Sequence, residues 1–218
     1  MSLKAAKIGI VGAGNVGATL AYGLMLLRIG VTIVLFDRTL SKAEGEAWDL
    51  EDAIPLCADL DVVPTDRYAD LADSDVIGEH GDSELIVWSS VTIGAIPLTA
   101  FLTPEITLES LKQGYTEATR KRGYDILQRK GHTSYGVATV VTQIVDAIWR
   151  DANKIFTVSV RPHPGYQVAR NVVLGLPCII GKKGIERSLL LPLNAEEQKL
   201  LDRSALRLSD AYEKLVTS

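Results

Sequence analysis

The chain has 218 residues, 47% hydrophobic and 23% charged, a balance that excludes a globally disordered protein. Its formal net charge is −4, so the chain lacks the excess of basic residues that is typical of a nucleic-acid-binding protein. No apolar run is long enough to span a bilayer. Two cysteines are too few for a disulfide framework, and these two lack the sequence spacing of metal ligands. We therefore expect a cytoplasmic protein without a metal, and neither nucleic acid nor a membrane as partner.

The first 76 residues alternate between strand and helix patterns. Short apolar runs predict buried strands at 7–11, 32–36 and 60–64. Good helix formers predict helices at 15–28 and 41–50, the second with Ser41 and Glu44 as a capping box. A further helix, turn and strand are expected from Tyr68 to Val76. This order indicates an α/β fold with a doubly wound, Rossmann-type parallel sheet.

The pattern changes after Val76. A polar loop at 78–84 is followed by segments with helical patterns at 108–130 and 135–151, and then by strand-like runs at 155–160 and 172–180. The prolines at 162 and 164 favour a turn. A final helix follows Asn194, with Glu197 completing a capping box. We therefore expect part of a dinucleotide-binding domain at 1–76 and an α+β substrate domain, which carries the catalytic residue, at 77–218.

A glycine-rich motif joins the first expected strand to the first helix. Gly12, Gly14 and Gly17 fit G-x-G-x-x-G, with Asn15 and Val16 between the last two glycines. The glycines allow a tight turn, close approach of a pyrophosphate, and close packing of helix on strand. The helix N-terminus then offers amide groups to the phosphates. These five residues are the expected phosphate-binding part of a cofactor site.

Asp37 ends the second expected strand, twenty residues after Gly17. An acid at this place accepts hydrogen bonds from the adenosine ribose and disfavours the 2′-phosphate of NADP. The neighbouring Arg38 argues weakly the other way. The motif and the acid together predict NAD as cofactor.

His80 stands among glycines and acids in the polar loop Gly78–Glu84. A histidine in a polar loop keeps a pKa suited to proton transfer near neutral pH. From the residues alone, a catalytic role and a structural role for His80 are equally good interpretations.

Several segments together resemble the L-lactate/malate dehydrogenase family. VIGEHGDSE, with the VWSS and TIGAIPL that follow, is similar to the segment of its catalytic histidine. Further similar segments lie along the chain: GAGNVGATLA, EGEAWDLEDAIP, KGHTSYG and LPCIIGKKGIE. The resemblance implies NAD-dependent interconversion of a small 2-hydroxy acid and its 2-oxo acid, with His80 as acid/base and Thr133 in the substrate pocket. It favours L-lactate over malate, and implies a glycolytic homodimer or homotetramer.

The chain departs from this family between Val76 and Ile77, where a large internal segment is missing. A fold with two mononucleotide halves would lose about 90 residues there, at about 30 for each βαβ unit. We expect the first strand to lose its neighbour on one side. The family's substrate-binding arginine, carbonyl-polarising arginine and histidine-orienting aspartate have no matching segments here. Three interpretations stay open: an active dehydrogenase, a non-catalytic remnant that binds a dinucleotide or a partner chain, and a protein containing a segment that this sequence omits.

Overall fold

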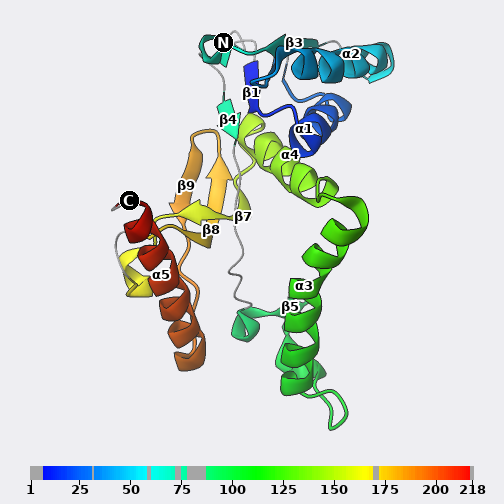
Figure 1. The fold of residues 1–218 in the computed structure, drawn as a ribbon. Helices are drawn as coiled ribbons and strands as arrows, with labels where there is room; N and C mark the ends of the chain where they lie inside the picture. The colour runs from blue at the N-terminus through cyan, green and yellow to red at the C-terminus, as the bar shows by residue number, and fades with distance from the viewer. Residues whose placement is uncertain are drawn as a thin grey trace. The chain divides into compact units, whose positions relative to one another are not determined.

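A computed structural model describes residues 7–30, 32–57, 60–71, 75–77, 87–168 and 172–216 (Figure 1). The chain forms two compact units, each made from two separate stretches. The first unit combines Met1–His80 with Asp125–Trp149, and the second combines Gly81–Tyr124 with Arg150–Ser218. The α/β fold class is confirmed, whereas the expected domain boundary at 76/77 stays a prediction.

The first unit is built on a four-stranded parallel sheet in the order β3-β2-β1-β4. Its strands are β1 (Lys7–Val11), β2 (Thr32–Phe36), β3 (Asp61–Thr65) and β4 (Asp75–Ile77). Helix α1 (Asn15–Leu26) connects β1 to β2, and α2 (Leu40–Cys57) connects β2 to β3. A 3₁₀ turn (Tyr68–Leu71) precedes β4. The predicted β-α-β-α-β order is confirmed.

The expectation that the first strand lacks a neighbour on one side was wrong. β4 pairs with β1 in parallel, with Ile8 opposite Asp75 and Ile10 opposite Ile77. Asp75 and Val76 lie just before the break from the family pattern and Ile77 directly after it, and together they supply main-chain partners for β1. Strand β3 forms the other edge of the sheet, where Pro64 costs no ladder hydrogen bond on the outer side.

Helix α2 differs from its prediction at both ends. It starts at Leu40, so Ser41 lies inside the helix rather than at its cap, and it continues to Cys57. Helix α2 begins before the predicted residue 41 because Asp37 Oδ1 accepts the amide of Thr39 at 3.1 Å. The Thr39 carbonyl then accepts the amides of Lys42 at 3.0 Å and Ala43 at 3.3 Å. A side chain before the helix therefore fixes its first turn.

Helices α1 and α4 (Tyr135–Trp149) pack side by side in the first unit (Figure 1). Leu20 and Leu24 of α1 share one core with Ala138 and Val145 of α4. The two helices come close at Gly23, where a Cβ would lie 2.8 Å from Thr142 Oγ1. Burying these apolar faces stabilises the unit by about 25 cal/mol for each Å² removed from water.

The second unit contains a small hairpin and a three-stranded antiparallel sheet. The hairpin pairs β5 (Thr92–Ile93) with β6 (Ile96–Pro97), between 3₁₀ turns at Trp88–Ser90 and Leu98–Phe101. The sheet has the order β7-β8-β9, with β7 (Lys154–Val160), β8 (Leu174–Gly181) and β9 (Gly184–Ser188). The long helix α3 (Leu108–Lys130) starts in this unit, and α5 (Ala195–Val216) belongs wholly to it.

Tyr166 is central to the second unit. It is 1% exposed and lies in a 3₁₀ turn (Pro164–Tyr166), so the turn expected at the two prolines is confirmed. Its hydroxyl donates to the Leu189 carbonyl at 2.8 Å and accepts the Leu191 amide at 3.0 Å. Its ring belongs to the same core as Leu174 of β8 and Leu201 of α5. Among the helices described, none has the length and apolar character needed to cross a membrane.

Candidate dinucleotide-binding site

The glycine-rich turn has the geometry that the motif predicts. Gly12 has a φ of +103°, a conformation that side chains rarely adopt, and its amide donates to the Phe36 carbonyl at 2.7 Å. At Gly17 a Cβ would lie 1.9 Å from the Gly12 carbonyl oxygen and 3.2 Å from Ile10 Cγ2. Only glycine at position 17 lets α1 lie this close to the turn and to β1.

The start of α1 is open to an anion. Its N-cap is Gly14, which has no side chain to accept the first amides, and the first turn contains no acidic residue. A Cβ on Gly14 would meet only Lys42 Nζ, at 3.9 Å. Asn15 and Val16 are both exposed in this first turn. Free amides and the positive end of the helix dipole are what a pyrophosphate requires.

Asp37 lies directly beside this turn, at the end of β2. Its Oδ2 accepts the Ala13 amide at 3.0 Å, and its own amide donates to the Thr65 carbonyl at 3.0 Å. The amide of Thr39 lowers the pKa of Asp37 most; burial raises it, and Lys42 and the Ala13 amide lower it further. The net effect is a carboxylate that is ionised at neutral pH.

The contacts of Asp37 include residues that the sequence reasoning missed. Lys42 Nζ lies 3.6 Å from Asp37 Oδ2, with half of its side chain exposed. Its place in the first turn of α2, five residues after the acid, was a usable signal, because one helical turn brings it back toward the strand end. Asp37 Oδ1 accepts the Thr39 amide, and its second lone pair can accept a ribose hydroxyl. The open helix start and this acceptor fit the pyrophosphate and adenosine ribose of NAD.

Thr133 lies in the same unit, in the short turn between α3 and α4, and is exposed. The turn starts at Gly131, whose φ is +81°. Lys130 Nζ lies 3.3 Å from Ser134 Oγ and 3.7 Å from the ring centroid of Tyr135. This lysine therefore connects the end of α3 to the residues that follow Thr133, and sequence reasoning had not singled it out. The assignment of Thr133 to a substrate pocket stays a prediction.

His80 lies outside the described residues, which stop at Ile77 and resume at Val87. Its role as acid/base therefore stays a prediction. Within the described ranges, no group of histidine, cysteine and acidic side chains is arranged to hold a metal ion.

The parallel sheet, the glycine turn and the acid at the end of β2 define a dinucleotide-binding α/β domain. Residues 6–78 match the description "lactate/malate dehydrogenase, NAD binding domain", and residues 60–218 match "lactate/malate dehydrogenase, alpha/beta C-terminal domain". The chain belongs to the lactate/malate dehydrogenase family, and its N-terminal part is an NAD-binding domain of these oxidoreductases.

Individual relatives of the chain are described as L-lactate dehydrogenases. The chain is 28% identical over 299 residues to an L-lactate dehydrogenase of Thermoanaerobacter sp. (strain X514), covering 91% of this chain and 96% of the relative. It is 39% identical over 140 residues to one of Oceanobacillus iheyensis, covering 63% of this chain and 43% of the relative. The first alignment is longer than the 218 residues of this chain, so the relative has residues without a counterpart here.

A solved structure shares the fold. It is a lactate dehydrogenase from a Medee basin deep-sea metagenome library, and it matches with a TM-score of 0.86 at 22% identity. The match covers 95% of this chain and 98% of that one.

Proposed function

We propose that the chain is an NAD-dependent oxidoreductase that interconverts a small 2-hydroxy acid, most specifically L-lactate, and its 2-oxo acid. The observation that carries this proposal is the hydrogen bond from the Ala13 amide to Asp37, which joins the Gly12–Gly17 turn to the acid at the end of β2. The L-lactate dehydrogenases among its relatives support the substrate class.

In this proposal the protein positions the reactants and moves one proton. A bound NAD would supply the hydride acceptor for C2 of the 2-hydroxy acid. The His80 imidazole takes the hydroxyl proton as the C2 oxygen becomes a carbonyl, and returns it in the reverse direction. Thr133 lines the substrate pocket, while the α1 amides and Asp37 hold the pyrophosphate and the adenosine ribose.

The test is NADH oxidation by pyruvate at high enzyme concentration, after intact mass has shown that the purified chain has 23.6 kDa. We expect turnover that is lost in His80→Ala, and a smaller rate with oxaloacetate. NADH binding without any pyruvate-dependent oxidation would instead establish the alternative, a chain that binds a dinucleotide and does not turn it over. A mass about 10 kDa higher, the weight of about 90 residues, would show that a segment is missing from the sequence.

We also propose that the protein acts in the cytoplasm, in glycolysis, as a homodimer or homotetramer. Trp48 on α2 is 61% exposed, and a large exposed aromatic side chain is typical of a surface that another chain covers. Light scattering at several protein concentrations measures the oligomeric state. A monomer at every concentration would contradict the homo-oligomer.

A further inference from the structure

A hydrogen-bonded turn follows β3 at the same edge of the sheet as Asp37. It runs from Thr65, the last residue of β3, to Asp70 in the 3₁₀ turn. The Asp70 carboxylate binds the Arg67 guanidinium twice, from Nη2 to Oδ1 at 2.9 Å and from Nε to Oδ2 at 3.1 Å. Asp70 Oδ2 also accepts the Thr65 hydroxyl at 2.5 Å. One carboxylate therefore closes the turn.

The Thr65 side chain is held in one orientation by these contacts. Thr65 is 4% exposed, and its Oγ1 accepts the Arg67 amide at 3.0 Å. The Thr65 hydroxyl lowers the pKa of Asp70 most; burial raises it, and Arg67 and Lys7 lower it further. Asp70 is thus an ionised acceptor at neutral pH, so the Thr65 proton must point toward it. Hydrogen bonds to an ionised acceptor are short and strong.

The same turn contacts the chain at Asp37 in two ways. The Asp37 amide donates to the Thr65 carbonyl at 3.0 Å, directly after the point where Phe36 lies opposite Thr65. The ring of Tyr68 stacks on the ring of Phe36, with centroids 4.2 Å apart and an interplanar angle of 29°. Because β3 is an edge strand of the described sheet, ladder bonds hold Thr65 from one side only. Its side chain supplies the remaining restraint.

We propose that Asp70 is a positioning residue for the cofactor: by fixing Thr65 and the turn after β3, it holds Asp37 in the orientation that receives the adenosine ribose. Asp70 itself does not touch the cofactor in this proposal. The inference rests on the proposed NAD-dependent function and concerns the adenosine half of the cofactor.

Three substitutions separate the parts of this network. Asp70→Ala removes every acceptor, whereas Asp70→Asn keeps the shape and one acceptor oxygen. Thr65→Val removes the hydroxyl but keeps the branched side chain and the carbonyl that binds the Asp37 amide. If Asp70 acts through Thr65, the effects of Asp70→Ala and Thr65→Val on affinity are less than additive.

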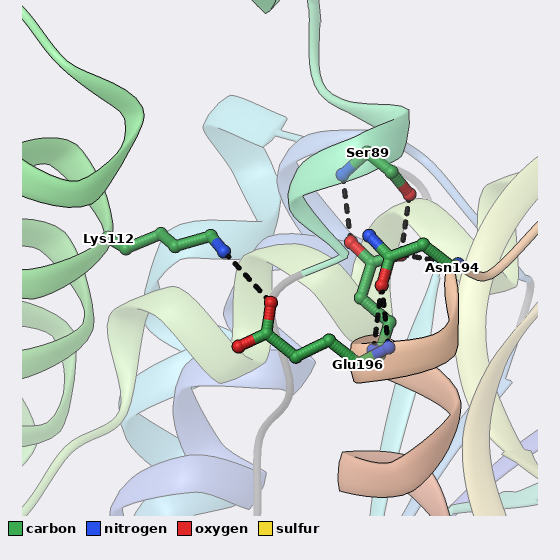
Figure 2. Close-up of polar contacts among 5 residues, drawn as sticks. Ser89, Lys112, Asn194 and Glu196 are labelled. Carbon is green, nitrogen blue, oxygen red and sulfur yellow. Dashed lines mark hydrogen bonds and ion pairs between the residues drawn. The ribbon is translucent and has the colours of Figure 1, made fainter.

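A similar contact in the second unit provides a matched control. Glu197 is 5% exposed, and its carboxylate anchors Ser89 by accepting the amide at 2.9 Å and the hydroxyl at 2.6 Å. Figure 2 shows this contact at the start of α5, where Asn194 caps the helix and Lys112 pairs with Glu196 at 3.4 Å. Glu197→Gln therefore perturbs a carboxylate–hydroxyl contact outside the cofactor-binding unit.

The experiment measures binding of ADP-ribose and of NADH by calorimetric titration, with urea unfolding of every variant alongside. ADP-ribose carries the adenosine and both phosphates but no nicotinamide. For Asp70→Ala we expect both Kd values to rise about tenfold, the size of one lost hydrogen bond. Asp70→Asn is expected to recover most of this affinity, and kcat at saturating NADH is expected to stay unchanged.

Two controls are expected to bind ADP-ribose like the parent. Asp66→Ala changes an exposed acid in the same turn, and Glu197→Gln lowers stability in the other unit. An unchanged ADP-ribose Kd in Asp70→Ala would overturn the proposal, because the network would then serve the fold alone. An equal loss of affinity in Glu197→Gln would also overturn it, since reduced stability would explain both results.

The remaining outcomes concern the route and the function. Fully additive effects of Asp70→Ala and Thr65→Val would overturn the proposal, since Asp70 would not act through Thr65. A parent chain that does not bind ADP-ribose would overturn both this inference and the proposed function. A parent chain that binds ADP-ribose without oxidising NADH in the presence of pyruvate would contradict the proposed function alone, because the ADP-ribose comparison still decides the role of Asp70.

Discussion

The backbone amide of Ala13 donates a hydrogen bond of 3.0 Å to Asp37 Oδ2, which joins the glycine-rich turn to the acid at the end of β2. The two residues are 24 positions apart, and each belongs to a different part of the expected cofactor site. The acid thus has two functions, because it shapes the turn before any ligand arrives and offers its remaining lone pairs to a ribose. Such a preformed site binds without the cost of ordering the turn.

Replacing Asp37 tests both functions at once. Asp37→Ala removes the acceptor for the Ala13 and Thr39 amides. A hydrogen bond to a charged group contributes about 1.5 to 3 kcal/mol, so we expect the NADH Kd to rise about ten- to hundredfold. The preference for NADH over NADPH is expected to fall as well, because the repelling charge is gone. Calorimetric titration measures both, with the exposed acid variant Asp49→Ala as the control that keeps normal affinity.

Gly17 is expected to tolerate no side chain. In Gly17→Ala the new methyl group would lie 1.9 Å from the Gly12 carbonyl oxygen, so the backbone turn must move. We expect a loss of about 3 kcal/mol or more in the free energy of unfolding, at the upper end of overpacking effects, and no measurable NADH binding. Urea unfolding and titration with NADH are the measurements.

Gly45 of α2 provides the matched control, since nothing lies within 4 Å of its added Cβ. Gly45→Ala is expected to raise stability by about 0.5 to 1 kcal/mol through helix propensity, with NADH affinity unchanged. Similar effects of the two substitutions would mean that the close approach at Gly17 is not required for the fold.

Local patterns in the sequence predicted the features of the fold and of the candidate site that depend on residues close together in the sequence. The glycine turn, the acid after β2 and the Asn194–Glu197 capping box all have local signatures, and the structure confirms each of these features. A strand was expected near Val76, but its pairing with β1 was missed, because the pattern of one strand does not report which strand lies beside it. The bonds of Glu197 to Ser89 were missed too, since the same box forms with or without a distant partner. Contacts between distant segments are decided by packing, which a pattern along the chain does not report.

The close approach of α1 and α4 makes Gly23 sensitive to substitution. In Gly23→Ala the new Cβ would lie 2.8 Å from Thr142 Oγ1, a buried hydroxyl that donates to the Ala138 carbonyl at 2.7 Å. We expect a loss of about 1 to 3 kcal/mol, because the two helices must separate. The KM for pyruvate is expected to rise as well, since α4 begins directly after the Thr133 turn.

A double-mutant cycle shows whether the loss comes from this contact. Thr142→Ala removes the hydroxyl that the new methyl group would meet, so the double variant is expected to recover part of the loss caused by Gly23→Ala. Additive effects of the two substitutions would show that the helices are not in contact at this point. Gly136→Ala, on the same helix α4 with nothing within 4 Å of its Cβ, is the control.

The Glu197 carboxylate that anchors Ser89 also predicts how stability depends on pH. The pKa of Glu197 is lowered in the folded protein, whereas in the unfolded chain it is that of an ordinary glutamate, about 4.3. A group with a lowered folded pKa stabilises the fold above its unfolded pKa, and this contribution is lost as the pH falls through the folded pKa. Glu197→Gln is therefore expected to be less stable than the parent by about 1.5 to 3 kcal/mol at pH 7, and the difference is expected to shrink below about pH 4.

Urea unfolding followed by Trp88 fluorescence, in a background with Trp48→Phe and Trp149→Phe, reports on the second unit, because of the three tryptophans only Trp88 belongs to it. Glu196→Gln, whose side chain is exposed, is expected to follow the parent curve at every pH, since a surface ion pair contributes little. A stability difference between Glu197→Gln and the parent that stays constant from pH 7 to pH 3 would contradict an ionised anchor. It would mean that the glutamine and the neutral glutamic acid differ in packing, because no proton would then be linked to the Ser89 contact.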